Sequence, residues 1–155
     1  MRRSAVFTIL LACATRAGAQ AAPNPDAGVH VSPALGVHYG SPLRFSASAG
    51  VLVDLNGNRN DGVVVMAELG QRGYEGSLGY FRMLGKFGSG YSMRAAVLRT
   101  TDDPWNASEH TTYAGVEGHW MIAFGVGGRV GYLRRVSTGS NQHDNLASLG
   151  LSIGL

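Results

Sequence analysis

The sequence predicts an all-β fold, an up-and-down antiparallel β-barrel of eight strands. Over long segments, apolar residues alternate with small or polar residues, which is the period of a β-strand. Turn clusters rich in Gly, Asn and Ser separate these segments at roughly one turn per strand, and this spacing favours a meander of sequential strands. In addition, no segment after residue 19 shows the period of a helix.

The first four strands are expected at residues 33–39, 43–55, 63–69 and 75–83. The strictest alternation is in 43–55, where every odd-numbered residue is apolar and most even-numbered residues are polar or Gly. A strand of about 9–11 residues is enough to cross a bilayer, so this segment is long enough. Segment 63–69 repeats the pattern with Glu68 on its second face, whereas 33–39 is short and 75–83 is weaker.

The last four strands are expected at residues 91–97, 111–120, 122–133 and 148–155. In 122–133 the apolar face is opposed by several Gly and by Arg129, and in 148–155 Leu and Ile alternate with Ser and Gly. No clear turn signal separates the sixth segment from the seventh, and we place the boundary at Trp120 and Met121. A single continuous strand at this point would break the even strand count.

The beginning of the chain is typical of a secretory signal peptide. Arg2 and Arg3 precede an apolar run of about ten residues, and small residues end at Ala19. The run is well short of the roughly 20 residues of a membrane-spanning helix. A second cleavage site stays open, because Leu-Leu-Ala before Cys13 is similar to a lipoprotein box. We therefore expect a signal peptide at 1–19, a flexible leader at 20–30 and a barrel domain at 31–155.

Charge and cysteine content exclude several classes of function. Three of the 13 Lys and Arg residues lie in 1–19, so ten remain against ten Asp and Glu in the mature chain. A nearly neutral chain does not indicate nucleic-acid binding. Cys13 is the single cysteine, which excludes disulfides, a thiolate nucleophile and a Cys-bound metal from the ordinary mature form. We expect no metal and no cofactor.

The second face of the strands carries charged residues in mid-strand: Arg44, Glu68, Arg94, Glu117 and Arg129. In a soluble barrel these side chains would face water, whereas in a membrane barrel they would meet in the lumen. The signal peptide and the unbroken apolar faces favour the membrane barrel. We predict a paired network that fills the lumen, with Asp54 and Glu75 nearer the rims, because eight strands leave no room for a wide pore. Interfacial aromatic belts are expected from Tyr39, Phe45, Tyr80, Tyr91, Trp120, Phe124 and Tyr132.

The last strand places Ser148, Gly150, Ile153 and Leu155 in the order polar, x, Gly, x, x, hydrophobic, x, hydrophobic. This order resembles the C-terminal insertion signal of outer-membrane β-barrels, although that family usually ends on an aromatic residue. In pattern, residues 33–155 also resemble small eight-stranded bacterial outer-membrane barrels. The resemblance implies a monomer in the bacterial outer membrane, in contact with its lipid and inserted by the barrel-assembly machinery.

The function expected from these features is non-enzymatic, a contribution to outer-membrane structure or surface interaction. Two alternatives stay open, a lipid-modifying outer-membrane enzyme and a soluble secreted ligand-binding β-barrel. Glu117 and His119 lie two residues apart on one strand face, a spacing that lets a carboxylate orient an imidazole. Lumen filling explains the same pair more simply, and we assign no catalytic residue.

Overall fold

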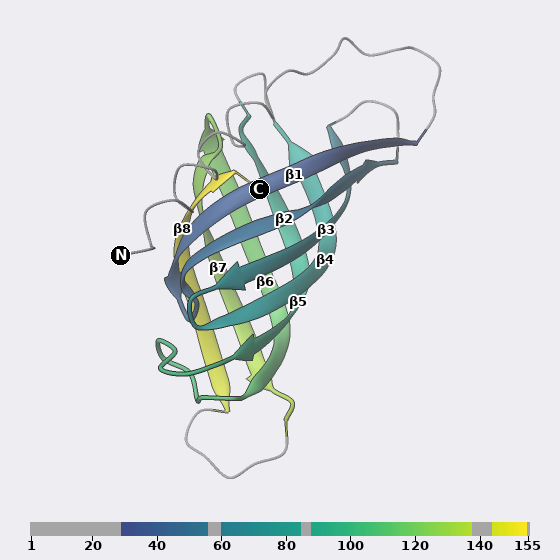
Figure 1. Ribbon diagram of the computed structural model, residues 1–155. Helices are drawn as coiled ribbons and strands as arrows, with labels where there is room; N and C mark the ends of the chain where they lie inside the picture. The colour runs from purple at the N-terminus through teal and green to yellow at the C-terminus, as the bar shows by residue number, and fades with distance from the viewer. Residues whose placement is uncertain (1–28, 56–59, 85–87, 138–143, 155) are drawn as a thin grey trace.

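The computed structural model describes residues 29–55, 60–84, 88–137 and 144–154, which form a closed antiparallel β-barrel (Figure 1). The strands are β1 (His30–Ser41), β2 (Arg44–Asp54), β3 (Asp61–Gly70), β4 (Gly73–Met83), β5 (Gly90–Thr100), β6 (Thr112–Ala123), β7 (Val126–Arg135) and β8 (Asn145–Gly154). Each strand pairs with its neighbour in the sequence, and β8 pairs with β1 to close the ring. The predicted all-β, up-and-down barrel of eight strands is confirmed. The signal peptide, Cys13 and most of the leader lie outside the described residues.

One predicted strand boundary is wrong. β6 continues through Trp120 and Met121 to Ala123, with a register shift between Met121 and Ala123. The turn to β7 consists of Phe124 and Gly125, which both have positive φ, 52° and 75°. Two positive φ angles match the twist of a tight hairpin, and such turns usually carry Asn or Asp before the Gly. Phe124 in that position gives no turn signal in the sequence.

The connections divide between the two ends of the barrel. The loop rim holds the β1–β2, β3–β4, β5–β6 and β7–β8 connections, including the long segment 101–111, and lies toward the bottom of Figure 1. The terminal rim holds the β6–β7 turn, the start of β1 and the end of β8. The end of β5, the start of β6, the end of β7 and the start of β8 therefore all lie at the loop rim.

The wall has apolar side chains outside and polar side chains inside. Leu69, Ile122 and Leu151 are each more than 70% exposed, whereas Glu68, Arg94 and Glu117 are no more than 4% exposed. Strand alternation produces this separation, since successive side chains point to opposite faces of a sheet. None of the described residues forms a helix that is long and apolar enough to cross a bilayer.

Two apolar clusters lie inside the barrel, one toward each rim. The loop-side cluster consists of Leu43, Ala96, Leu98, Tyr113, Leu133 and Leu146. The terminal-side cluster consists of Ala34, Val64, Met66 and Phe81, with Leu52 and Met83 packed against it. The charged side chains of the interior occupy the level between these clusters, so the lumen has three layers: apolar, charged and apolar.

Candidate functional site

The middle layer of the lumen gathers charged and imidazole side chains from six strands. We call it the charged layer, and its members are His38, Glu68, Glu75, Arg94, Glu117, His119 and Arg129. All of them are buried. The structure thus brings together four of the five residues predicted for the lumen network, Glu68, Arg94, Glu117 and Arg129. His38, His119 and Glu75 complete the layer.

The central contact of the layer is the ion pair between Arg129 and Glu68. Arg129 Nη1 donates to both carboxylate oxygens of Glu68, at 3.0 and 2.8 Å. Since β7 and β3 are four strands apart in a ring of eight, this pair spans the lumen. The Ser46 hydroxyl donates a further hydrogen bond to Glu68 at 2.5 Å. Charge-assisted hydrogen bonds of this kind are roughly twice as strong as neutral ones.

A second group of contacts lies along β4, β5 and β6. Arg94 on β5 and Glu117 on β6 are cross-strand partners, so their opposite charges lie on adjacent strands. Arg94 Nε also donates to Ser92 Oγ at 2.9 Å. Glu75, expected nearer a rim, is the cross-strand partner of Glu68 on one side and of Leu98, a member of the loop-side cluster, on the other. It therefore lies at the loop-rim edge of the charged layer. Three carboxyl groups therefore share two guanidinium groups.

A glycine on β7 makes room for this arrangement. A Cβ atom built on Gly131 would lie 2.6 Å from Glu117 Cγ and 2.9 Å from its Oε1. Real Cβ atoms are not found this close to other heavy atoms, so any larger residue at position 131 would displace the Glu117 side chain. The glycines of the inner face thus provide the volume that the long charged side chains occupy.

The two histidines contact the carboxylates but not in the geometry of a hydrolytic triad. In a triad, the serine and the carboxylate contact opposite nitrogens of the imidazole. Here Ser48 Oγ and Glu68 Oε2 both approach Nε2 of His38, at 2.9 and 3.8 Å, and Nδ1 has no polar partner among the described residues. His38 also meets His119 edge to face, with ring centroids 6.0 Å apart.

The second imidazole, His119, contacts Glu117 Oε2 through Nε2 at 3.2 Å. The serine opposite it on β5, Ser92, accepts a hydrogen bond from Arg94, and among the described residues no hydrogen bond joins Ser92 to the imidazole. Both histidines are buried in the barrel interior. This geometry favours lumen filling over acyl transfer.

Arg44 is the one predicted lumen residue that the structure places elsewhere. It is the first residue of β2 and has a positive φ of 62°, which interrupts the alternation that would direct it inward. Its Nη2 donates to Asp103 Oδ2 at 2.8 Å, and its guanidinium lies over the Trp105 ring, 5.3 Å from the centroid. Arg72 contacts the same carboxylate at 3.1 Å. Arg44 therefore anchors segment 101–111 at the loop rim.

The residues of the predicted insertion signal divide between the two faces of β8. Ser148 is fully buried in the lumen, and Ile153 points outward. Gly150 lies beside Arg129, since a Cβ atom built on it would be 3.4 Å from Arg129 Nε. Leu155 lies outside the described residues. Within the described part of the chain, no group of three or more His, Cys, Asp and Glu side chains is arranged to hold a metal ion.

Sequence reasoning missed the two apolar clusters that cover the charged layer. Leu98, Leu133 and Leu146 are inward-facing residues, so they fall on the face that otherwise carries polar side chains. In the sequence these three leucines interrupt the alternation of apolar and polar residues.

Comparison of the chain with protein-family models, curated protein sequences and solved structures gave no match.

Proposed function

We propose that the chain is an exported bacterial outer-membrane β-barrel protein without catalytic activity, which contributes to outer-membrane structure or surface interaction. The observation that carries the proposal is the polarity of the barrel wall, apolar outside and charged inside. In a water-soluble barrel the apolar side chains would fill the interior, and the charged ones would face solvent. The reverse arrangement suits a lipid environment.

The distribution of outward-facing charges supports this proposal. Among the described strand residues, the outward charged side chains lie only near strand ends: Asp61 and Arg82 near the terminal rim, Arg99 and Arg134 near the loop rim. Charged groups are costly at the middle of a bilayer and much less so at its interfaces. The strands contain 10 to 12 residues, which suits the about 9–11 residues that a tilted strand needs to cross the hydrocarbon region.

Exposed aromatic side chains lie near both rims, as expected for membrane interfaces. Tyr91 and Trp120 are cross-strand partners toward the terminal rim, and Phe124 is in the turn at that rim. Tyr39 and Tyr74 are exposed toward the loop rim. An exposed apolar band of this extent on a soluble monomer would be an aggregation hazard. A surrounding bilayer removes that hazard.

Closure of the ring and the filled lumen define what such a barrel does. A closed ring satisfies the backbone hydrogen bonds without an open edge, which a bilayer requires. The charged layer and the two apolar clusters occupy the interior, so we propose a structural or surface role and not a porin-like channel. The signal-peptide pattern of residues 1–19 supports export, with the loop rim outside the cell and insertion by the barrel-assembly machinery.

Heat-modifiability after membrane fractionation tests the proposal. The protein, expressed in a bacterium with its own residues 1–19, should be recovered in the outer-membrane fraction and should migrate differently on a gel before and after boiling. Recovery as a soluble periplasmic protein without a mobility shift would reject the proposal. That result would instead favour the soluble secreted ligand-binding barrel.

A further inference from the structure

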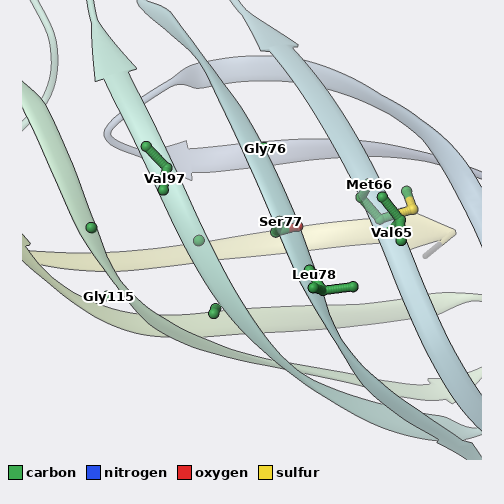
Figure 2. Close-up of a pocket in the computed structure, with 10 residues that line it drawn as sticks. Val65, Met66, Gly76, Ser77, Leu78, Val97 and Gly115 are labelled. Atoms are coloured by element: carbon green, nitrogen blue, oxygen red, sulfur yellow. The ribbon is translucent and has the colours of Figure 1, made fainter.

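The outer surface of the barrel has a groove across β3 to β6. Its volume is about 490 Å³, and its lining is almost wholly apolar, with Gly76 in the middle and Val65, Leu78 and Val97 around it (Figure 2). A Cβ atom built on Gly76 would meet nothing within 4 Å, so no other atom fills the space directly above Gly76. Val65, Leu78 and Val97 are all exposed, which places the groove on the outside of the wall.

The strand register places cationic and polar residues beside this groove, at its β7 side and in the next row toward the loop rim. Gly76, Val97, Ala114 and Arg134 follow one another as cross-strand partners from β4 to β7. In the next row toward the loop rim, Tyr74, Arg99 and Thr112 are partners in the same way. The groove is therefore apolar along its length, with Arg134 beside it on β7 and Arg99 one row nearer the loop rim on β5.

Both arginines are free to bind an anion. Arg99 Nη1 donates to the Thr112 hydroxyl at 3.0 Å, and within the described ranges neither Arg99 nor Arg134 has a carboxylate at ion-pair distance. The other arginines of the loop rim differ, because Arg44 and Arg72 share Asp103. A guanidinium group without an anionic partner, beside a hydroxyl donor, is suited to bind a phosphate.

We infer that this groove binds one acyl chain of a phosphate-bearing lipid, whose head group contacts Arg99 and Arg134. The inference rests on the proposed membrane location and adds a specific lipid to it. The order of the features matches such a lipid, with the phosphate at the level of the loop rim and the chain directed toward mid-wall. If a second copy of this barrel docked around this face, its Arg99 and Arg134 would lie close to the same arginines of the first copy, and like charges would repel. Charge complementarity therefore favours an anionic lipid.

Native mass spectrometry of the full barrel in nanodiscs tests the inference. The probe is phosphatidic acid at about one tenth of the lipid in phosphatidylcholine, and the readout is the number of lipid molecules retained on the released barrel. The unsubstituted barrel should retain one phosphatidic acid in preference to phosphatidylcholine. Arg99→Gln and Arg134→Gln should each reduce retention about fivefold, the effect of one cation near a lipid surface.

Two further variants separate the groove from general surface charge. Gly76→Leu fills the floor and leaves both arginines in place, so it should reduce retention as well. Arg82→Gln removes an outward arginine near the terminal rim, away from the groove, and should leave retention unchanged. An equal loss in Arg82→Gln, unchanged retention in Gly76→Leu, or a barrel dimer in place of bound lipid would overturn the inference.

Failure of the lipid site and failure of the proposed function give different results. A barrel that inserts into nanodiscs and shifts on heating, but retains no phosphatidic acid, overturns only the lipid site. A chain that does not insert rejects the membrane location, and the lipid site is rejected with it.

Discussion

Arg129 on β7 and Glu68 on β3 form a buried ion pair across the full width of the lumen, with both Glu68 oxygens within 3.0 Å of Arg129 Nη1. It connects opposite walls of the ring, whereas most barrel contacts connect adjacent strands. Apolar clusters toward both rims separate it from bulk water. Each charge of the pair therefore stabilises the other in place of the water that both lose on folding.

Removing one partner of this pair should strongly destabilise the barrel. Arg129→Met leaves Glu68 buried without its cation, and we expect a loss of about 3–5 kcal/mol in the free energy of unfolding. Urea titration in lipid vesicles, followed by gel mobility, measures this loss. The double variant Glu68→Gln/Arg129→Met should recover a large part of it. Equal stability of the wild type and Arg129→Met would show that water reaches the pair and screens it.

The inner glycine next to Glu117 and the outer glycine in the groove form a matched pair of sites. Gly131→Ala should destabilise the barrel by about 1–3 kcal/mol, because the added methyl group meets the Glu117 side chain. Gly76→Ala adds the same methyl group to open space and should change stability by less than about 0.5 kcal/mol. The same urea titration compares them. Equal losses in the free energy of unfolding would contradict the assignment of Gly131 to the inner face and Gly76 to the outer face.

The loop-side apolar cluster should contribute to stability and should help to close the lumen. Leu98 is fully buried in it, so Leu98→Ala should cost about 2–5 kcal/mol. The charged layer and the terminal-side cluster still block the lumen in this variant. We therefore expect neither the wild type nor Leu98→Ala to give steady ion conductance in a planar bilayer. A stable open channel in the wild type would refute the filled lumen.

The ion pair at the loop rim should contribute much less than the pair in the lumen. Arg44 and Asp103 are partly or largely exposed, and exposed ion pairs are worth about 0–1 kcal/mol. Arg44→Gln should thus leave the unfolding transition nearly unchanged. It should instead make segment 101–111 more sensitive to protease, since Arg44 contacts both Asp103 and Trp105. A loss of several kcal/mol would show that Arg44 acts in the core and not at the rim.

The sequence predicts the eight strands well because alternation is a direct consequence of a wall with two different faces. It also predicts which charged residues share the inner face, since Glu68, Arg94, Glu117 and Arg129 all lie within regular strands. The predicted lumen position of Arg44 is wrong because a positive φ at the start of β2 changes the direction of its side chain. No sequence pattern indicates that angle. The predicted boundary between the sixth and seventh strands is wrong for the same reason, because Phe124 is a bulky residue in a turn position with positive φ.

The sequence does not predict the contacts across the lumen, because these contacts depend on the closure and tilt of the ring. The pairing of Arg129 with Glu68 joins strands that are four apart in the ring, so it forms only when the closed barrel brings β7 and β3 to face each other. The local alternation of residues contains no information about that closure. The position of Glu75 at the loop-rim edge of the charged layer follows from its register between Glu68 and Leu98. Sequence reasoning therefore gives the members of the site more readily than their partners.

The two tryptophans of the chain allow a direct test of whether the apolar wall contacts lipid. In Trp105→Phe the remaining tryptophan is Trp120, on the outward face of β6. After reconstitution into vesicles with brominated acyl chains, Trp120 fluorescence should be strongly quenched by the lipid and little affected by aqueous iodide. Quenching by iodide alone, with a protein that stays in the soluble fraction, would show that the wall does not contact lipid.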